Sequence, residues 1–273
     1  MKKISLLLLF IVTLVSSSCE EVVQVDLDTA APKLVIEATI KWQKGTAGNN
    51  QKIKLTTTTS YFSNIIPTVS GAKITVKNSS NTVFTFNEIA TSGEYGCSNF
   101  VPKINETYTL TVIANGQTYT ASEILKSVAP IDEIEQKNDG GFTGKDIQLK
   151  TYFTDPAPET NYYLYQYSYT GQVTQTFYGD IDTFFQGNKF FSLSQNDDLK
   201  IGDEVSVTHY GISKTYYNYM SILISIAGGS SGGPFQAPPA TVRGNIINTT
   251  NKDNYALGYF ALTEIDSRVF TIK

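Results

Sequence analysis

The sequence predicts a mostly β fold, and three observations support this. Aromatic residues make up 12% of the 273 residues, with 17 Tyr and 15 Phe, and such residues favour strands over helices. Short segments with alternating apolar and polar residues recur along the chain, as expected for strands that bury one face. Asn115-Gly116 lies between two of these segments and is a strong signal for a tight β-hairpin.

Residues 32–129 are expected to form an N-terminal β-sandwich of the immunoglobulin or transthyretin type. Six or seven strands over about ninety residues, with turns between them, are typical of such a sandwich. A looser hairpin is expected at Asn78-Ser79-Ser80-Asn81, and a domain boundary near Pro130. The alternating segments are KLVIEATIK, QKIKLTTTT, AKITVKN, NTVFTFN, TYTLTVIA and QTYTASE.

Residues 130–273 are expected to form a second β-rich domain that contains one helix. Its strand candidates are IQLKTYF, NYYLYQYSY and EVSVTHY. The period then changes, and a helix is expected near residues 213–227, with Ser213 as its cap and Gly228-Gly229 as its end. Three isoleucines at alternate positions in this segment leave a strand open as the alternative. The helical stripe comprises Tyr216, Tyr219, Met220, Leu223 and Ile226.

Residues 1–18 have the pattern of a secretory signal peptide. Lys2 and Lys3 precede a short apolar run that ends in small residues, and the run is too short for a comfortable membrane span. Cys19 follows directly, and this end resembles a lipobox, which implies that the Cys19 thiol receives lipid. The alternative is an ordinary signal peptide and a disulfide between Cys19 and Cys97.

Residues 19–31 are expected to be an acidic tether after the lipidated cysteine. Without Lys2 and Lys3 the chain holds 19 basic and 25 acidic residues, which excludes the strongly basic proteins that bind nucleic acid. The tether is either a solvated linker or, by resemblance, a signal for export to the outer face of the outer membrane. Its acids are Glu20, Glu21, Asp26 and Asp28.

The mature chain resembles the family called domain of unknown function 4249. The segments GGPFQAPPATVRGNIIN and YALGYFALTE carry the most specific part of the resemblance, and TVSGAKITVKN, TYTLTVIANGQTYTA and DIQLKTYFTDPAPETNYYLYQY extend it upstream. The resemblance implies a lipoprotein of the outer membrane that works beside a TonB-dependent transporter. It implies no catalytic residue and no cofactor.

Several residue patterns suggest chemistry, but each has a simpler interpretation. Residues 228–232 match G-x-S-x-G, yet a predicted helix precedes the serine where a hydrolase has a strand. His209 is the only histidine, and we expect it to be packed rather than catalytic. Cys97 is expected to be an inert thiol. Acidic residues that could serve a glycan hydrolase are Asp180, Asp182, Asp197, Asp198, Asp203 and Glu204, and solvated turns are the alternative.

Four tyrosines on one face of a predicted strand leave two interpretations open. They pack against the opposing sheet of a sandwich, or they form an exposed platform for a ligand or partner. These residues are Tyr163, Tyr165, Tyr167 and Tyr169.

We therefore expect a non-catalytic lipoprotein, anchored in the outer membrane and exposed at the cell surface. Its expected role is to capture a ligand or brace a TonB-dependent transporter during nutrient uptake. The alternatives are a structural or adhesive surface lipoprotein and a carboxylate-based glycan hydrolase.

Overall fold

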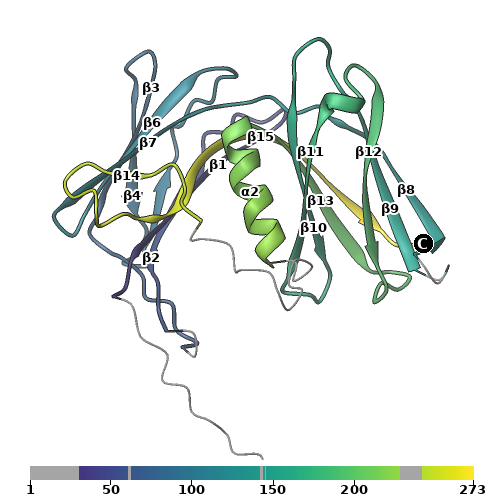
Figure 1. Ribbon diagram of the computed structural model, residues 1–273, viewed down its shortest axis with the longest axis horizontal. Coiled ribbons are helices and arrows are strands. Elements are labelled where there is room, and N and C mark those ends of the chain that lie inside the picture. Colours follow the sequence, from purple (N-terminus) through teal and green to yellow (C-terminus); the bar gives the residue numbers. More distant parts are fainter. Residues whose placement is uncertain (1–30, 61–62, 142–143, 145, 228–241) are drawn as a thin grey trace, which may run out of the picture. The chain divides into compact units, whose positions relative to one another are not determined.

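The computed structural model describes residues 31–60, 63–141, 144, 146–227 and 242–273, and Figure 1 shows their arrangement. Seven strands form in the first half, where the sequence alternates between apolar and polar residues. In the first of them Ile36, Ala38 and Ile40 are buried and Glu37 is exposed, as the period of two requires. The strands are β1 (Leu34–Gln43), β2 (Gln51–Thr57), β3 (Lys73–Asn78), β4 (Val83–Glu88), β5 (Glu94–Cys97), β6 (Thr107–Ala114) and β7 (Gln117–Ile124).

The second half contributes further strands, one short 3-10 helix and one α-helix. The predicted mostly β fold is therefore confirmed over the described residues. The elements are β8 (Ile131–Gly140), β9 (Asp146–Thr154), β10 (Tyr162–Tyr169), β11 (Gln175–Ile181), η1 (Asp182–Phe184), β12 (Lys189–Asn196), β13 (Glu204–Ile212), α2 (Lys214–Ala227), β14 (Ile247–Asn248) and β15 (Leu257–Thr271).

Both predicted hairpins are present. Asn115 and Gly116 connect β6 to β7 with φ of 51° and 71°, because a two-residue turn of this kind requires positive φ at both positions. At the turn between β3 and β4, the Thr82 N–H donates to Asn78 Oδ1 over 2.8 Å, and Asn81 has a φ of 65°. Asparagine tolerates this conformation better than most residues, which explains its place in both turns.

The strands form one sheet of twelve and one of three. The orders are β11-β10-β13-β15-β1-β2-β5-β4-β3-β6-β7-β14 and β12-β9-β8. The long last strand joins the two halves, since β15 pairs in parallel with β1 through residues 257–265 and antiparallel with β13 through residues 265–271. Strand β15 belongs to residues 130–273 but also pairs with β1 of residues 32–129. Pro32–Lys273 accordingly forms one compact unit.

Three separate clusters of buried residues lie within this unit, and the third packs α2 against β10, β13 and β15. The core of the first half is mostly aliphatic, with Ile36, Leu55 and Val112 among its buried residues, and Phe260 of β15 completes it. The core of the second half is mostly aromatic and packs β9 against β10 and β13, with Phe153 at its centre. Strand β15 therefore contributes side chains to all three clusters, with Phe260 in the first, Phe270 packed against the second and Tyr259 in the third.

Helix α2 forms where the sequence predicts a helix, and the strand alternative is excluded. The Tyr216 N–H donates to Ser213 Oγ over 3.1 Å, so Ser213 caps the first turn as expected. Tyr216, Tyr217, Tyr219, Met220 and Ile224 pack toward β10, β13 and β15. The predicted stripe is correct at its start and wrong at its end, because Ile226 is exposed and Ile224 packs instead.

The end predicted for α2 at Gly228-Gly229 lies outside the described residues. The same holds for the predicted signal peptide and for all of the acidic tether except Ala31. Among the described residues, no helix has the length and apolar character needed to cross a membrane.

Candidate functional site

The four tyrosines of β10 are core residues. Tyr163, Tyr165, Tyr167 and Tyr169 expose only 1%, 0%, 0% and 5% of their surface. The Tyr163 hydroxyl donates to Asp155 Oδ1 over 2.5 Å, and the Tyr167 hydroxyl donates to Thr151 Oγ1 over 3.1 Å. The hypothesis of an exposed tyrosine platform is therefore corrected. These rings fill the space between two sheets, and the hydroxyls of Tyr163, Tyr167 and Tyr169 hydrogen-bond buried polar groups there. The Tyr165 hydroxyl makes no hydrogen bond with the described residues.

His209 lies within this aromatic core and has no access to solvent. Its ring stacks on Tyr165, with centroids 4.6 Å apart and planes 11° apart, and Phe153 lies 4.7 Å away. Burial lowers the pKa of His209 to about 3, against a smaller opposing effect of the Ala129 backbone. Neither ring nitrogen makes a well-formed hydrogen bond with the described residues. His209 is thus a neutral packed side chain, as expected.

The six candidate acids fall into two groups. Asp197, Asp198, Asp203 and Glu204 lie in and after the turn between β12 and β13, as the solvated-turn interpretation predicts. Asp180 and Asp182 lie at the end of β11, where burial raises the pKa of Asp180 to about 6. Asp182 is buried and accepts a hydrogen bond from the Asn161 N–H over 2.7 Å. This second group therefore contains one acid held by backbone and one partly buried acid.

Cys97 ends β5 as a buried free thiol, and its S–H donates to Asn99 Oδ1 over 3.1 Å. Cys19 and the G-x-S-x-G match at residues 228–232 lie outside the described residues. The described part of the chain contains no cluster of three or more His, Cys, Asp or Glu residues suited to a metal ion.

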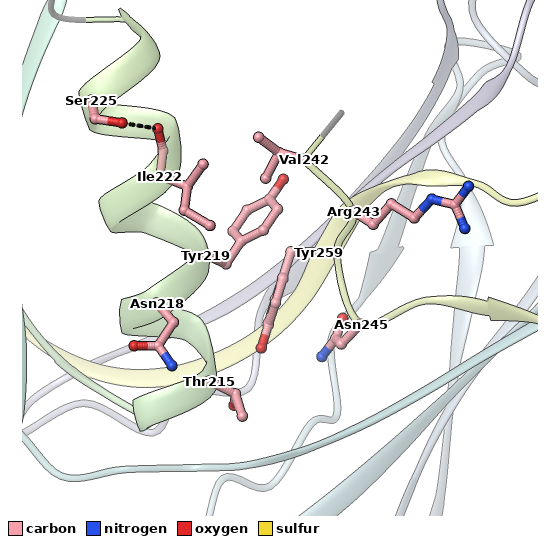
Figure 2. Close-up of a pocket in the computed structure, with 10 residues that line it drawn as sticks. Thr215, Asn218, Tyr219, Ile222, Ser225, Val242, Arg243, Asn245 and Tyr259 are labelled. Atoms are coloured by element: carbon pink, nitrogen blue, oxygen red, sulfur yellow. Dashed lines mark hydrogen bonds between the residues drawn. The ribbon is translucent and has the colours of Figure 1, made fainter. Parts of the chain in front are cut away.

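A groove of about 740 Å³ lies between α2, residues 242–245 and β15. Figure 2 shows Tyr219 and Ile222 projecting from the helix toward Val242 and Tyr259, while Arg243 points away. The lining is mainly apolar, and its polar groups are hydroxyls, amides and one guanidinium. It comprises Thr215, Asn218, Tyr219, Ile222, Ser225, Val242, Arg243, Gly244, Asn245 and Tyr259.

The floor of the groove is a fixed aromatic cluster. The Tyr259 ring lies 4.7 Å from Tyr219 and 4.8 Å from Tyr216, measured between centroids. The Tyr259 hydroxyl donates to Glu123 Oε2 over 3.0 Å, and Thr215 Oγ1 donates to the same oxygen over 3.2 Å. Burial, together with the charge of Glu123, raises the pKa of Tyr259 well above its usual value. One carboxylate from β7 thus holds both the floor and the first turn of α2.

The wall opposite the helix is held by a glycine and an asparagine. The Asn245 side chain pairs with the backbone of Phe260 on β15, donating to its carbonyl oxygen over 2.8 Å and accepting from its N–H over 2.9 Å. Gly244 lies so close to β15 that a Cβ there would overlap the carbonyl oxygen of Gly258. Larger residues at 244 would push this wall away from the sheet.

An aromatic ring between two cations supports the same wall. Arg243 Cζ and Lys33 Nζ each lie 3.8 Å from the centroid of the Tyr255 ring. Cations at this distance are attracted by the face of the ring. These contacts connect the wall to the residue that precedes β1.

The family described as domain of unknown function (DUF4249) matches residues 20–268. The chain belongs to this family. The segment that carried the resemblance, GGPFQAPPATVRGNIIN, contains Gly244 and Asn245, the two residues that hold the groove wall close to β15. The remainder of that segment up to Thr241 lies outside the described residues.

Two other comparisons add little to the family assignment. No curated protein matches the chain. Among solved structures, the chain is similar to a segment of two fibronectin type III domains from chicken tenascin, with 12% identity and a TM-score of 0.22. The similarity covers 66% of this chain and 90% of the tenascin segment.

Sequence reasoning missed the groove, because its residues come from three separated segments. One signal was available, since the helix KTYYNYMSILISIA has no charged residue after Lys214 and is apolar on more than one face. A helix of this kind covers a sheet with one face and leaves a second apolar face for other contacts. No carboxylate, imidazole or thiol is among the described residues that line the groove.

Proposed function

We propose that this protein is a non-catalytic lipoprotein, anchored through Cys19 in the outer membrane and exposed at the cell surface. We further propose that it binds a TonB-dependent transporter through the groove beside α2 and assists that transporter in nutrient uptake. The observation that carries the proposal is the groove itself, whose lining includes Gly244 and Asn245 of the segment that carries the resemblance. The anchor and the transporter rest on the lipobox-like sequence at Cys19 and on the family resemblance.

The chemistry of the groove favours a protein segment as its occupant. Ile222 lines the groove and is 45% exposed, and Ile226, one turn further along the helix, is 43% exposed. Residues four apart lie on the same side of a helix, so these two extend an apolar stripe beyond the groove. A volume of about 740 Å³ accommodates a few side chains of a partner. The Asn218 amide, which also lines the groove, can pair with the backbone of such a segment.

The non-catalytic part of the proposal is supported by how the reactive groups are used. His209 is enclosed by rings, and Asp182 holds a backbone N–H. Asp197, Asp198, Asp203 and Glu204 lie in or beside a turn, away from the residues that line the groove. This arrangement gives a carboxylate-based hydrolase no pair of acids across the groove.

Affinity capture of the intact protein from gently solubilised outer membranes tests the proposal. We expect the native protein to bring a TonB-dependent transporter with it, and Ile222→Glu to reduce recovery of the transporter by about tenfold or more, because a carboxylate would be buried at the contact. Val173→Glu is the control, since Val173 is apolar and exposed but lies in the turn between β10 and β11, away from α2 and outside the groove lining.

The two variants also separate the outcomes. Melting temperatures equal to that of the native protein would show that both variants fold normally. Recovery of the native protein alone would contradict the transporter partnership. Undiminished recovery of the transporter with Ile222→Glu would contradict the groove as the contact.

A further inference from the structure

The loop between β2 and β3 is an uncharged projection at the end of the sheet where β1 begins. The sequence has no charged residue between Lys54 and Lys73. Two large apolar side chains on this loop are exposed to solvent, Ile65 by 75% and Ile66 by 62%. Two adjacent isoleucines held in water are costly unless another surface covers them.

Hydrogen bonds hold the base of the loop beside the first residues of the sheet. The Thr58 N–H donates to the Lys33 carbonyl oxygen, and the Lys33 N–H donates to Thr58 Oγ1, each over 2.9 Å. The Thr57 N–H donates to the Pro67 carbonyl oxygen over 2.9 Å and closes the other side. In Figure 1 the loop extends past the first residue of β1. The isoleucines are thus tied to the point where the N-terminal segment joins the sheet.

The segment between Cys19 and the base of the loop is short. Thirteen residues separate Cys19 from Lys33, and an extended chain of that length reaches at most about 45 Å. An anchor at Cys19 would therefore keep the loop near the bilayer whatever path the tether takes. Lys33 and Arg243, which flank the Tyr255 ring, place two cations at the base of the loop. Cations at this position suit the phosphates of lipid head groups.

We propose that the loop around Ile65 and Ile66 inserts into the interfacial region of the bilayer and forms a second membrane contact beside the lipid anchor. The inference rests on the proposed anchoring through Cys19. Apolar side chains at the level of the lipid head groups bind weakly by themselves, but a tether raises their effective concentration at the membrane. The contact would fix the orientation of the folded unit above the bilayer.

Spin-label depth measurement on the full processed chain tests this contact. The intact lipoprotein with Ile65→Cys is spin-labelled and reconstituted in vesicles of phosphatidylethanolamine and phosphatidylglycerol. Cys97 is buried and gives little background. We expect the ratio of label accessibility to oxygen over accessibility to a water-soluble nickel complex to be about fivefold or more above that at Val173→Cys. Val173 is the matched control, because it is apolar, 98% exposed and in the turn between β10 and β11.

Flotation of the vesicles distinguishes failure of the loop contact from failure of the lipid anchor. Protein that floats with the vesicles but carries a label at 65 as accessible to nickel as the label at 173 overturns the loop contact and leaves the anchor standing. A label shielded from both reagents also overturns it, since another copy of the protein would then cover the loop. Protein that does not float overturns the anchor, and the loop contact with it.

Discussion

Gly258→Ala is expected to destabilise the protein by about 4 kcal/mol or more. Gly258 lies in β15 opposite Ile36 of β1, with a φ of +94°. A Cβ at this position would overlap the carbonyl oxygen of Ile36 and lie 2.8 Å from its carbonyl carbon. Both atoms are backbone, so neither strand can yield without breaking the parallel pairing that joins the two halves. Chemical unfolding monitored through Trp42 measures the loss.

Gly202→Ala is the control for this substitution. Gly202 has the same φ of +94°, but no atom lies within 4 Å of the position that a Cβ would occupy. It therefore carries only the conformational cost of an L-residue at this φ, about 1–2 kcal/mol. Equal losses of folding free energy for the two variants would show that only the backbone conformation matters. That result would contradict the close approach of β15 to β1.

The stability of the native protein is expected to fall in acid because of His209. The folded pKa is about 3 against 6.5 for the free side chain, so between these values the unfolded chain binds a proton that the folded chain does not. Folding stability therefore falls as the pH falls, by about 1.4 kcal/mol for each pH unit below 6.5. Denaturant unfolding at pH 7 and at pH 4.5 should differ by roughly 2–3 kcal/mol because of this residue.

His209→Phe separates this effect from the other titrating groups. Phenylalanine keeps the ring stacked among Phe153, Tyr163 and Tyr165 and removes the titration. Asp180 acts in the opposite direction, because its raised folded pKa of about 6 makes the folded chain bind a proton first, but it is present in both proteins and cancels in the difference. Identical pH dependence of the native protein and the variant would mean that the ring is open to water.

Local features of the fold are well predicted from the sequence, because they depend on neighbouring residues. Alternation of apolar and polar residues places β1, β3, β6 and β10, and the asparagine-glycine pair places the tight hairpin. Ser213 caps α2 as predicted, since the cap depends on residues within one turn. The packing of His209 follows from its place on the same strand face as Val205 and Val207.

Features that depend on distant contacts could not be predicted. The alternating tyrosines of β10 fit either a buried or an exposed face, and only the opposing strand β9 decides between them. Ile226 continues the helical stripe in sequence but lies beyond the sheet that α2 covers. Likewise, the groove needs α2, residues 242–245 and β15 at once. Nothing local marks Gly258 as the position where β15 approaches β1.

Photocrosslinking in living cells tests the central claim most directly, namely that the groove beside α2 is the contact with a TonB-dependent transporter. A photoreactive phenylalanine analogue placed at Ile222 should give an adduct whose tryptic peptides come from such a transporter, and the same analogue at Val173 should give none. An adduct at both positions, or at neither while the protein is present at native levels in the outer membrane, would contradict the account.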